Sequence, residues 1–193
     1  MTRRNKDLLL VALGLIMAAA GLFLRLTEQQ EQLAGENAAL LLEAVSQQLP
    51  AAPAEPLPAE EPEDKPQSLA VMGYDVLGTL RIPSVDIDLS VLNEWSYDLL
   101  TVAPCRYSGS IETGDLVILG HSYRTHLRPL RQVVGGDAVE LTDAAGTVHR
   151  YVVAETEILR GSDGSLLPSG YPLTIFTCTA DSKHRFLARC AEA

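Results

Sequence analysis

The sequence has few basic residues. It carries 15 lysines and arginines against 25 aspartates and glutamates, for a formal net charge of −10 and a pI near 4.8. Nucleic acids and anionic membrane surfaces are bound through basic patches, and the basic residues here are scattered apart from a group at the N-terminus. We therefore expect neither nucleic acid nor an anionic lipid surface as a partner.

Cysteine and histidine are also scarce. Three cysteines cannot all pair within one chain, which excludes a fully disulfide-bonded framework and leaves at least one thiol free. No two of the four histidines show the spacing to cysteines or carboxylates that a zinc site needs. The sequence therefore predicts no metal site, and it contains no internal repeat.

A long uncharged run lies near the N-terminus. Basic residues within positions 3–6 precede the uncharged residues 8–24, which as a helix would span about 26 Å, slightly less than a ~30 Å hydrocarbon layer. The basic flank predicts a cytoplasmic N-terminus and an exported remainder. We expect residues 1–26 to form a cytoplasmic tip and a retained signal-anchor transmembrane helix. The alternative is a signal peptide that is cut after residues 18–20.

Two segments of different composition follow. Residues 27–49 are rich in Gln, Glu, Ala and Leu, with a leucine at every seventh position, as at Leu33 and Leu40. Two heptads are too few to predict a coiled coil, so we expect a solvated juxtamembrane helix. Residues 50–66 hold six prolines and five acidic residues, a composition that predicts an extended spacer. We assign residues 27–71 as a helical stalk and linker.

Residues 72–193 carry nearly all of the strand-like patterning. Short runs of apolar and β-branched residues alternate with turn residues, and the predicted strands are 76–82, 85–91, 116–119, 138–141, 148–159, 171–177 and 185–190. Residues 96–102 and 125–133 are expected to form short helices, and 161–170 a polar loop. Asp86 and Asp88 alternate with apolar residues, which predicts a solvated strand face and not a catalytic pair. Many short strands with few helices predict a mostly β domain, a closed or nearly closed barrel.

One cysteine lies at the end of a predicted strand. Cys178 follows a run of apolar and β-branched residues, and a side chain at a strand end can be exposed at a barrel rim. A thiolate there is a strong nucleophile, although a buried, inert thiol is the alternative. Arg185 begins the next predicted strand. Its positive charge can hold the carbonyl oxygen of a substrate and stabilise the oxyanion that forms when the thiolate attacks that carbonyl. Arg189 lies on the same strand face but further from Cys178.

A histidine follows another predicted strand. His121 comes directly after Gly120, and its imidazole can protonate a leaving amine and later deprotonate an incoming one. The alternative is a hydrogen-bonded loop histidine without a chemical role. We expect His121, Cys178 and Arg185 to form one site.

Three motifs in this region resemble those of one family. The run Thr174-Ile175-Phe176-Thr177-Cys178 resembles the Thr-Leu-x-Thr-Cys motif of sortases, the cysteine transpeptidases of Gram-positive surfaces. Residues 117–121 are similar to the family's histidine motif, and residues 184–189 resemble its arginine strand. The motifs occur in the family order of His, Cys and Arg, within residues 74–190. The short domain and the Thr-Cys-Thr context are most similar to the small class D or class E enzymes.

The resemblance implies a mechanism. Cys178 would attack the peptide bond after the threonine of a Leu-Pro-x-Thr-Gly-like sorting signal and form a thioacyl enzyme. His121 would protonate the departing amine, Arg185 would bind substrate and stabilise the oxyanion, and Thr177 would contact substrate. An amine from a cell-wall precursor, or a pilin lysine, would then release the product as a new amide.

The resemblance also implies partners and a location. The expected partners are surface proteins that bear a sorting signal, and the expected protein is a single-pass membrane protein with a cytoplasmic N-terminus and an external catalytic domain. No cofactor is implied, and calcium dependence stays open.

Several alternatives are open. The chain can be a pilin-polymerising sortase, or a non-catalytic, membrane-tethered binding module with the same fold. An L,D-transpeptidase is more remote, since the Ser-x-Gly-Cys context of that family is absent. The loop 179–184 is short for a sortase, and Cys105 stands where relatives often carry a small residue. A disulfide between Cys105 and Cys190 is a further open alternative.

Overall fold

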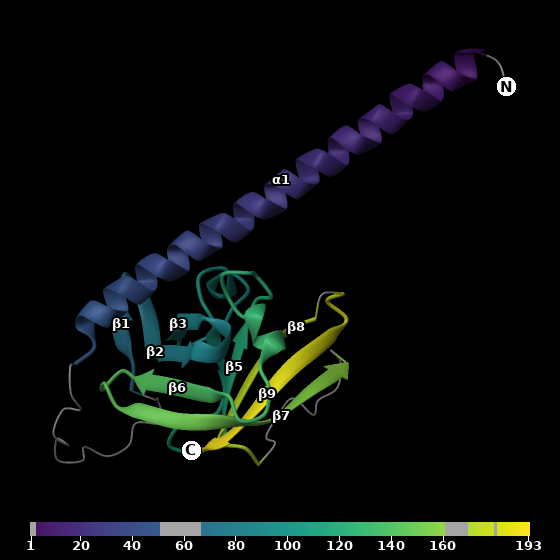
Figure 1. The fold of residues 1–193 in the computed structure, drawn as a ribbon. Helices are drawn as coiled ribbons and strands as arrows, with labels where there is room; N and C mark the ends of the chain where they lie inside the picture. The colour runs from purple at the N-terminus through teal and green to yellow at the C-terminus, as the bar shows by residue number, and fades with distance from the viewer. Residues whose placement is uncertain (1–2, 51–66, 161–169, 180) are drawn as a thin grey trace. The chain divides into compact units, whose positions relative to one another are not determined.

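The computed structural model describes residues 3–50, 67–160, 170–179 and 181–193 (Figure 1). The chain forms two compact units, Met1–Leu33 and Ala34–Ala193. One helix, α1 (Arg3–Gln48), contributes residues to both units. The predicted proline-rich spacer and the predicted polar loop at 161–170 lie almost wholly outside the described residues.

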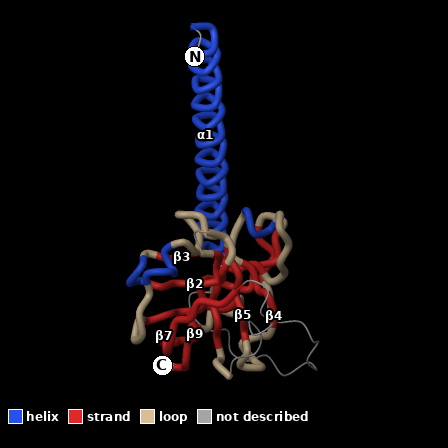
Figure 2. The backbone as a smooth tube through the Cα atoms, turned by 90° about the vertical axis from the view of Figure 1, so that its right-hand side faces the viewer, coloured by secondary structure: helices blue, strands red, loops and turns tan. Residues whose placement is uncertain are grey.

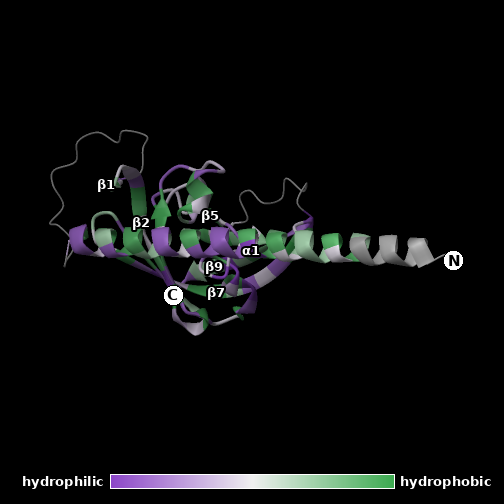
Figure 3. Cartoon of the chain, turned by 90° about the horizontal axis from the view of Figure 1, so that it is seen from above, coloured by the Kyte–Doolittle hydropathy of each residue, from purple (hydrophilic) through white to green (hydrophobic). Residues whose placement is uncertain are grey.

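The first unit consists of the N-terminal part of α1. Within the described residues, α1 provides the one stretch, Ala12–Gln48, that is long and apolar enough to cross a membrane by length and composition. Its most apolar window is entirely unburied, and large side chains such as Ile16 and Phe23 are exposed. Figure 3 shows hydrophobic colour along this part of the helix and more hydrophilic bands toward its C-terminal end. This composition is compatible with a membrane anchor.

The second unit is built on a β-barrel (Figure 2). The strands found in the described residues are β1 (Leu69–Val71), β2 (Tyr74–Ile82), β3 (Ile87–Leu92), β4 (Cys105–Ser108), β5 (Leu116–Gly120), β6 (Ala138–Asp143), β7 (Val148–Arg160), β8 (Leu173–Cys178) and β9 (His184–Glu192). They are hydrogen-bonded in the order β1-β2-β3-β4-β5-β8-β9-β7-β6, and an additional pairing of β2 with β6 closes the eight strands from β2 to β6. The predicted mostly β, closed barrel is confirmed.

Alternating side chains fill the barrel. Because successive residues of a strand point to opposite faces, every second residue of each strand faces the interior. Fully buried residues of this core include Leu80, Ile118, Leu141, Leu173 and Ile175, from four different strands. The outward-facing residues Val117, Phe176 and Leu187 form a separate buried cluster on β5, β8 and β9.

The last part of α1 belongs to the second unit and differs from the predicted solvated helix. Ala34, Ala38, Leu41 and Val45 are buried. Their spacing of four, three and four residues places them on one face of the helix. The heptad leucines lie elsewhere: Leu40, for example, is 55% exposed. The helix therefore packs through two alanines, a leucine and a valine, and the leucines at seven-residue spacing do not mark the buried face.

Some local predictions were wrong in detail. The strand predicted to begin at residue 85 begins at Ile87, because Pro83–Val85 form a 3-10 turn that ends at Asp86 in the left-handed conformation, with φ of 54°. The face of β3 that carries Asp88 was predicted to be solvated, but Ser90, two residues further on the same face, is buried. The two predicted helices are the shorter 3-10 turns η2 (Leu99–Thr101) and η3 (Pro129–Gln132). Strands β1 and β4 were not predicted.

Candidate active site

Strand pairing brings three predicted site residues to one end of the barrel. β5 and β8 run parallel with Gly120 opposite Thr177, so His121 and Cys178 follow on neighbouring strand ends. β8 and β9 run antiparallel, with Cys178 directly opposite Arg185. Residues opposite each other in an antiparallel pair have Cβ atoms roughly 5 Å apart. A thiol, a guanidinium and an imidazole therefore gather where β5, β8 and β9 meet.

Thr177 ties two of these strands together. Its side chain is buried, and its hydroxyl donates a hydrogen bond of 2.8 Å to the carbonyl oxygen of Gly120. The bond links the residue before Cys178 to the residue before His121. The side chain of Thr177 thus fixes the relative position of the two strand ends.

Cys178 differs from the other two cysteines in its surroundings. All three cysteines are free, so the disulfide between Cys105 and Cys190 is not formed. Cys105 and Cys190 are fully buried in different core clusters, and burial raises the pKa of each thiol to about 12. Cys178 is only partly buried. Of the three thiols, it alone is open to a reactant.

This difference predicts a labelling pattern. A maleimide added to the native protein should modify one thiol per chain, on Cys178, because the two buried thiols are shielded and stay protonated near neutral pH. After unfolding in guanidinium, three thiols per chain should react. Intact-mass spectrometry counts the adducts. Two or more adducts on the native chain would contradict the burial of Cys105 or Cys190.

Arg185 is held by backbone carbonyls and not by a carboxylate. Its Nη1 donates to the carbonyl oxygens of Ser182 at 3.4 Å and of His184 at 3.2 Å. Among the described residues, no carboxylate lies within ion-pair distance of Arg185. Its positive charge is therefore not neutralised beside the thiol.

Arg189 has a different environment. Its side chain is only 7% exposed, and it forms ion pairs with Glu157 at 3.0 Å and Glu155 at 3.7 Å. The two carboxylates neutralise the charge of the Arg189 guanidinium, which indicates a structural role for this residue on the wall of the barrel.

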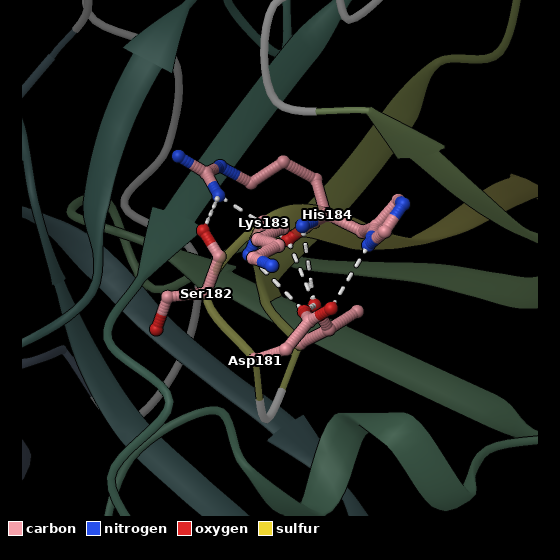
Figure 4. A network of polar contacts seen from close by, with 6 residues as sticks. Asp181, Ser182, Lys183 and His184 are labelled. Atoms are coloured by element: carbon pink, nitrogen blue, oxygen red, sulfur yellow. Dashed lines mark hydrogen bonds and ion pairs between the residues drawn. The ribbon is translucent and has the colours of Figure 1, made fainter.

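The turn between Cys178 and Arg185 is braced internally (Figure 4). Asp181 accepts hydrogen bonds from the Thr179 hydroxyl and from the Lys183 backbone N–H, and these bonds lower the pKa of Asp181 to about 2. The Thr179 hydroxyl also lies 3.2 Å from the His184 backbone N–H, which donates to it, and His184 Nδ1 lies 3.3 Å from the second Asp181 oxygen. These contacts hold the ends of the short turn together.

His121 is partly buried beside an aromatic ring. Its imidazole stacks on Tyr123 with ring centroids 4.8 Å apart and planes inclined by 30°. Burial lowers the pKa of His121 below its usual value of 6.5, since it disfavours the imidazolium. The neutral imidazole is therefore the resting form near neutral pH.

A row of aromatic side chains leads away from the Cys178 strand, and the sequence analysis missed it. Phe176 contacts Tyr107 and Tyr107 contacts Trp95, each with ring centroids 5.5 Å apart, and Trp95 contacts Tyr97 at 6.0 Å. Phe176 precedes Cys178 by two residues, so both side chains point to the same face of β8. Tyr97 is 78% exposed. One sequence signal was available, since Trp95 is the only tryptophan of the chain.

The loops that carry this row are fixed by Arg106. Its Nε donates to the backbone carbonyl and the side-chain oxygen of Asn93, each at 2.9 Å, and its Nη1 donates to the Gly109 carbonyl at 3.2 Å. The aromatic row is therefore presented on a braced surface beside the candidate nucleophile. Within the described part of the chain, no group of three or more His, Cys, Asp or Glu residues is placed to hold a metal ion.

Comparison with known proteins identifies the family. Residues 80–193, more than half of the chain, match the family model of the Sortase domain. No curated protein sequence matches at a significant level.

Among solved structures, sortase A from Corynebacterium diphtheriae is 26% identical to this chain, with a TM-score of 0.56. The match covers 62% of this chain and 61% of that chain, so this chain spans about three fifths of that relative. A Clostridium perfringens sortase D5 transpeptidase is 19% identical, with a TM-score of 0.55 over 62% of this chain and 79% of the other. Listeria monocytogenes sortase A is 22% identical, with a TM-score of 0.55 over 61% and 87%. The last two show the fold alone. The chain belongs to the sortase family of cysteine transpeptidases.

Proposed function

We propose that this sortase cleaves a sorting signal with Cys178 as nucleophile, His121 as general acid and base, and Arg185 as the oxyanion-stabilising group. The observation that carries the proposal is the register of β8 and β9, in which the one partly exposed thiol lies opposite an arginine that has no carboxylate partner among the described residues. The end of β5 brings His121 to the neighbouring strand.

The proposed reaction has two halves. The Cys178 thiol first gives its proton to neutral His121. The resulting thiolate attacks the carbonyl carbon of the threonine in a Leu-Pro-x-Thr-Gly-like signal, and the carbonyl electrons move to the oxygen, where Arg185 stabilises the negative charge. The carbonyl re-forms, the bond to glycine breaks, and protonated His121 gives its proton to the departing amine. A second amine then attacks the thioester and loses a proton to His121. Cys178 leaves as a thiolate, and a new amide remains.

Arg185 is suited to this task because its present partners are weak ones. The carbonyl oxygens of Ser182 and His184 lie in the turn next to the site, at 3.4 and 3.2 Å. A carbonyl partner leaves the net charge of the guanidinium intact, and an oxyanion is a stronger acceptor than a carbonyl. The substrate can therefore replace these contacts without breaking an ion pair.

Thr177 and the aromatic row have separate roles in this proposal. Thr177, with its buried hydroxyl bonded to Gly120, acts by holding the strand ends and not by touching the peptide through that hydroxyl. The aromatic row from Phe176 to Tyr97 offers an apolar surface for peptide residues next to the scissile bond.

The proposed setting is the outer face of a membrane. The apolar part of α1 would anchor the chain with its N-terminus in the cytoplasm, the partners would be surface proteins that bear sorting signals, and the acceptor would be an amine of a cell-wall precursor. A pilin lysine is the alternative acceptor. The similarity to small class D or class E enzymes remains a prediction.

One experiment tests this function. The full chain in detergent is incubated with sorting-signal pentapeptides, alone and with either an oligoglycine or a lysine peptide as acceptor, and the products are identified by mass spectrometry. Transfer to an acceptor is expected, and the preferred acceptor separates wall attachment from pilin assembly. Hydrolysis alone would indicate a peptidase. Absence of both cleavage and labelling by a peptidyl vinyl sulfone would favour a binding module.

The two arginines of β9 provide a matched pair. Arg185→Ala should lower kcat/KM for the peptide by roughly 10²–10³-fold with little change in Tm, because it removes the proposed oxyanion contact and no ion pair. Arg189→Ala should leave kcat per folded molecule nearly unchanged but cost about 1–2 kcal/mol of stability, since it breaks the contacts with Glu157 and Glu155. Steady-state kinetics and urea unfolding measure both. If Arg189→Ala lost activity and Arg185→Ala lost only stability, Arg189 and not Arg185 would be the oxyanion-stabilising group.

A further inference from the structure

A second histidine, His126, follows His121 by five residues and has no part in the proposed reaction. It is 1% exposed, and its Nε2 lies 3.3 Å from the carbonyl oxygen of Ala34 in α1. Because a carbonyl oxygen only accepts, Nε2 must carry the proton and donate. Nδ1 is then a bare acceptor with no partner among the described residues. Burial lowers the pKa of His126, as expected for a histidine that stays neutral.

An aromatic stack connects this histidine to His121. The ring of Tyr123 lies 4.8 Å from the His121 imidazole and 5.4 Å from that of His126. The backbone between them is a closed turn, in which Leu127 N–H donates to the His121 carbonyl and His126 N–H donates to the Tyr123 carbonyl, each at 3.1 Å. The imidazole of His121 therefore rests on Tyr123, which in turn contacts His126.

The helix approaches this turn closely at a glycine. A Cβ atom at Gly35 would lie 2.7 Å from Cγ2 of Thr125, closer than real Cβ contacts, so a larger residue at this position requires Thr125 to shift. Next along the helix, Ala38 joins the barrel core together with Leu127. The helix and the turn after His121 thus approach each other at Ala34 and at Gly35.

The contact is not a continuous packed interface. A cavity of about 330 Å³ adjoins it, lined in part by Gly35, Asp86, Asp88, Arg124 and His126. The hydrogen bond from His126 and the close approach at Gly35 are two specific contacts between the turn and the helix.

We propose that His126 is a positioning residue for His121, and that the stretch of α1 from Ala34 to Val45 is the support that holds it in place. This inference rests on the proposed role of His121 as general acid and base. Proton transfer depends on the direction of the imidazole, and a displacement of about 1 Å can cost ~10²-fold in rate. The stretch of α1 from Ala34 to Val45 thereby affects the reaction rate, because it holds the turn that sets the direction of the His121 imidazole.

The test at His126 compares two substitutions in the full chain in detergent. His126→Leu removes the donor, and we expect kcat for sorting-signal cleavage to fall about 10- to 100-fold, while KM and the rate of maleimide labelling of Cys178 change by less than twofold. His126→Gln restores an N–H donor near the Nε2 position and should recover most of kcat. The acidic and basic limbs of the pH–rate profile should also move in His126→Leu, because the direction and surroundings of His121 change.

The helix side has its own test. Gly35→Ala should lower kcat about tenfold, and adding Thr125→Ser, which removes the crowded Cγ2 atom while keeping the hydroxyl, should restore part of it. Leu40→Ala, on an exposed face of the same helix, is the control and should have no effect. Rates are expressed per folded chain, which is taken as the fraction that gains one maleimide adduct and not three.

Three results would overturn the inference: unchanged kcat in His126→Leu, equal loss in His126→Gln and His126→Leu, or equal effects of Gly35→Ala and Leu40→Ala. Failure of the proposed function is a separate result, since the wild-type chain would then neither cleave nor transfer the peptide.

Discussion

Replacing Cys178 with alanine is expected to lower kcat/KM for a sorting-signal peptide by roughly 10⁴-fold or more, because no other group can form the thioacyl bond. The side chain is only partly buried and belongs to no core cluster, so the loss of its sulfur should change Tm little. Cleavage followed with a quenched fluorescent peptide gives the rate, and circular dichroism gives the stability.

Cys190→Ala is the matched control for this prediction. Cys190 is fully buried in the barrel core, so its truncation should cost about 1 kcal/mol of stability but preserve kcat per folded molecule. If Cys178→Ala retained cleavage at a rate above a tenth of the wild type, Cys178 would not be the nucleophile. If both variants lost activity in proportion to their unfolded fraction, the effect would be one of stability.

Replacing Gly78 with alanine is expected to destabilise the barrel by about 3 kcal/mol or more. A Cβ atom at this position would lie 2.0 Å from the backbone oxygen of Thr142. Gly78 pairs with Val91 of β3 and with Asp143 of β6, beside an irregularity in the β2–β3 register. The clash is with backbone, so relief requires β2 to move away from β6. That pairing closes the barrel.

Urea unfolding of the two proteins measures this loss, which for a chain of this length corresponds to a Tm lower by roughly 6–12 °C. Gly135→Ala is the control, because the nearest atoms to its added Cβ lie at 3.7 Å, an ordinary contact. Its free energy of unfolding should stay within about 0.5 kcal/mol of the wild type. Equal stability of Gly78→Ala and the wild type would show that the β2–β6 edge can shift to accept a side chain.

Much of the barrel could be predicted because local patterns and packing agree. In β3, Ile87, Leu89 and Val91 alternate with more polar residues, and the structure buries all three in the core. Strand β7 was predicted nearly at its observed bounds, since its length and β-branched residues leave little ambiguity. By contrast, β4 contains Arg106 and Tyr107 in only four residues and has no pattern to detect.

The helix face shows where pattern reading fails. The leucines at seven-residue spacing form a regular apolar pattern, yet Leu33 and Leu40 are exposed. Alanines contribute little to such a signal, so the stripe through Ala34 and Ala38 was overlooked. A small residue is favoured where the helix lies close against another element, and that closeness exists only in the folded protein.

The sequence by itself determined the chemical groups and their places on strands: a thiol at the end of one strand, a histidine after another and an arginine at the start of a third. It also determined the family, through the order of these motifs. Only the tertiary structure decided that β5 and β8 lie parallel, which puts His121 beside Cys178. It also decided which thiols are buried and which arginine of β9 pairs with carboxylates. The physical reason is that burial and cross-strand pairing depend on residues far apart in the chain, whereas periodicity reports only on neighbours.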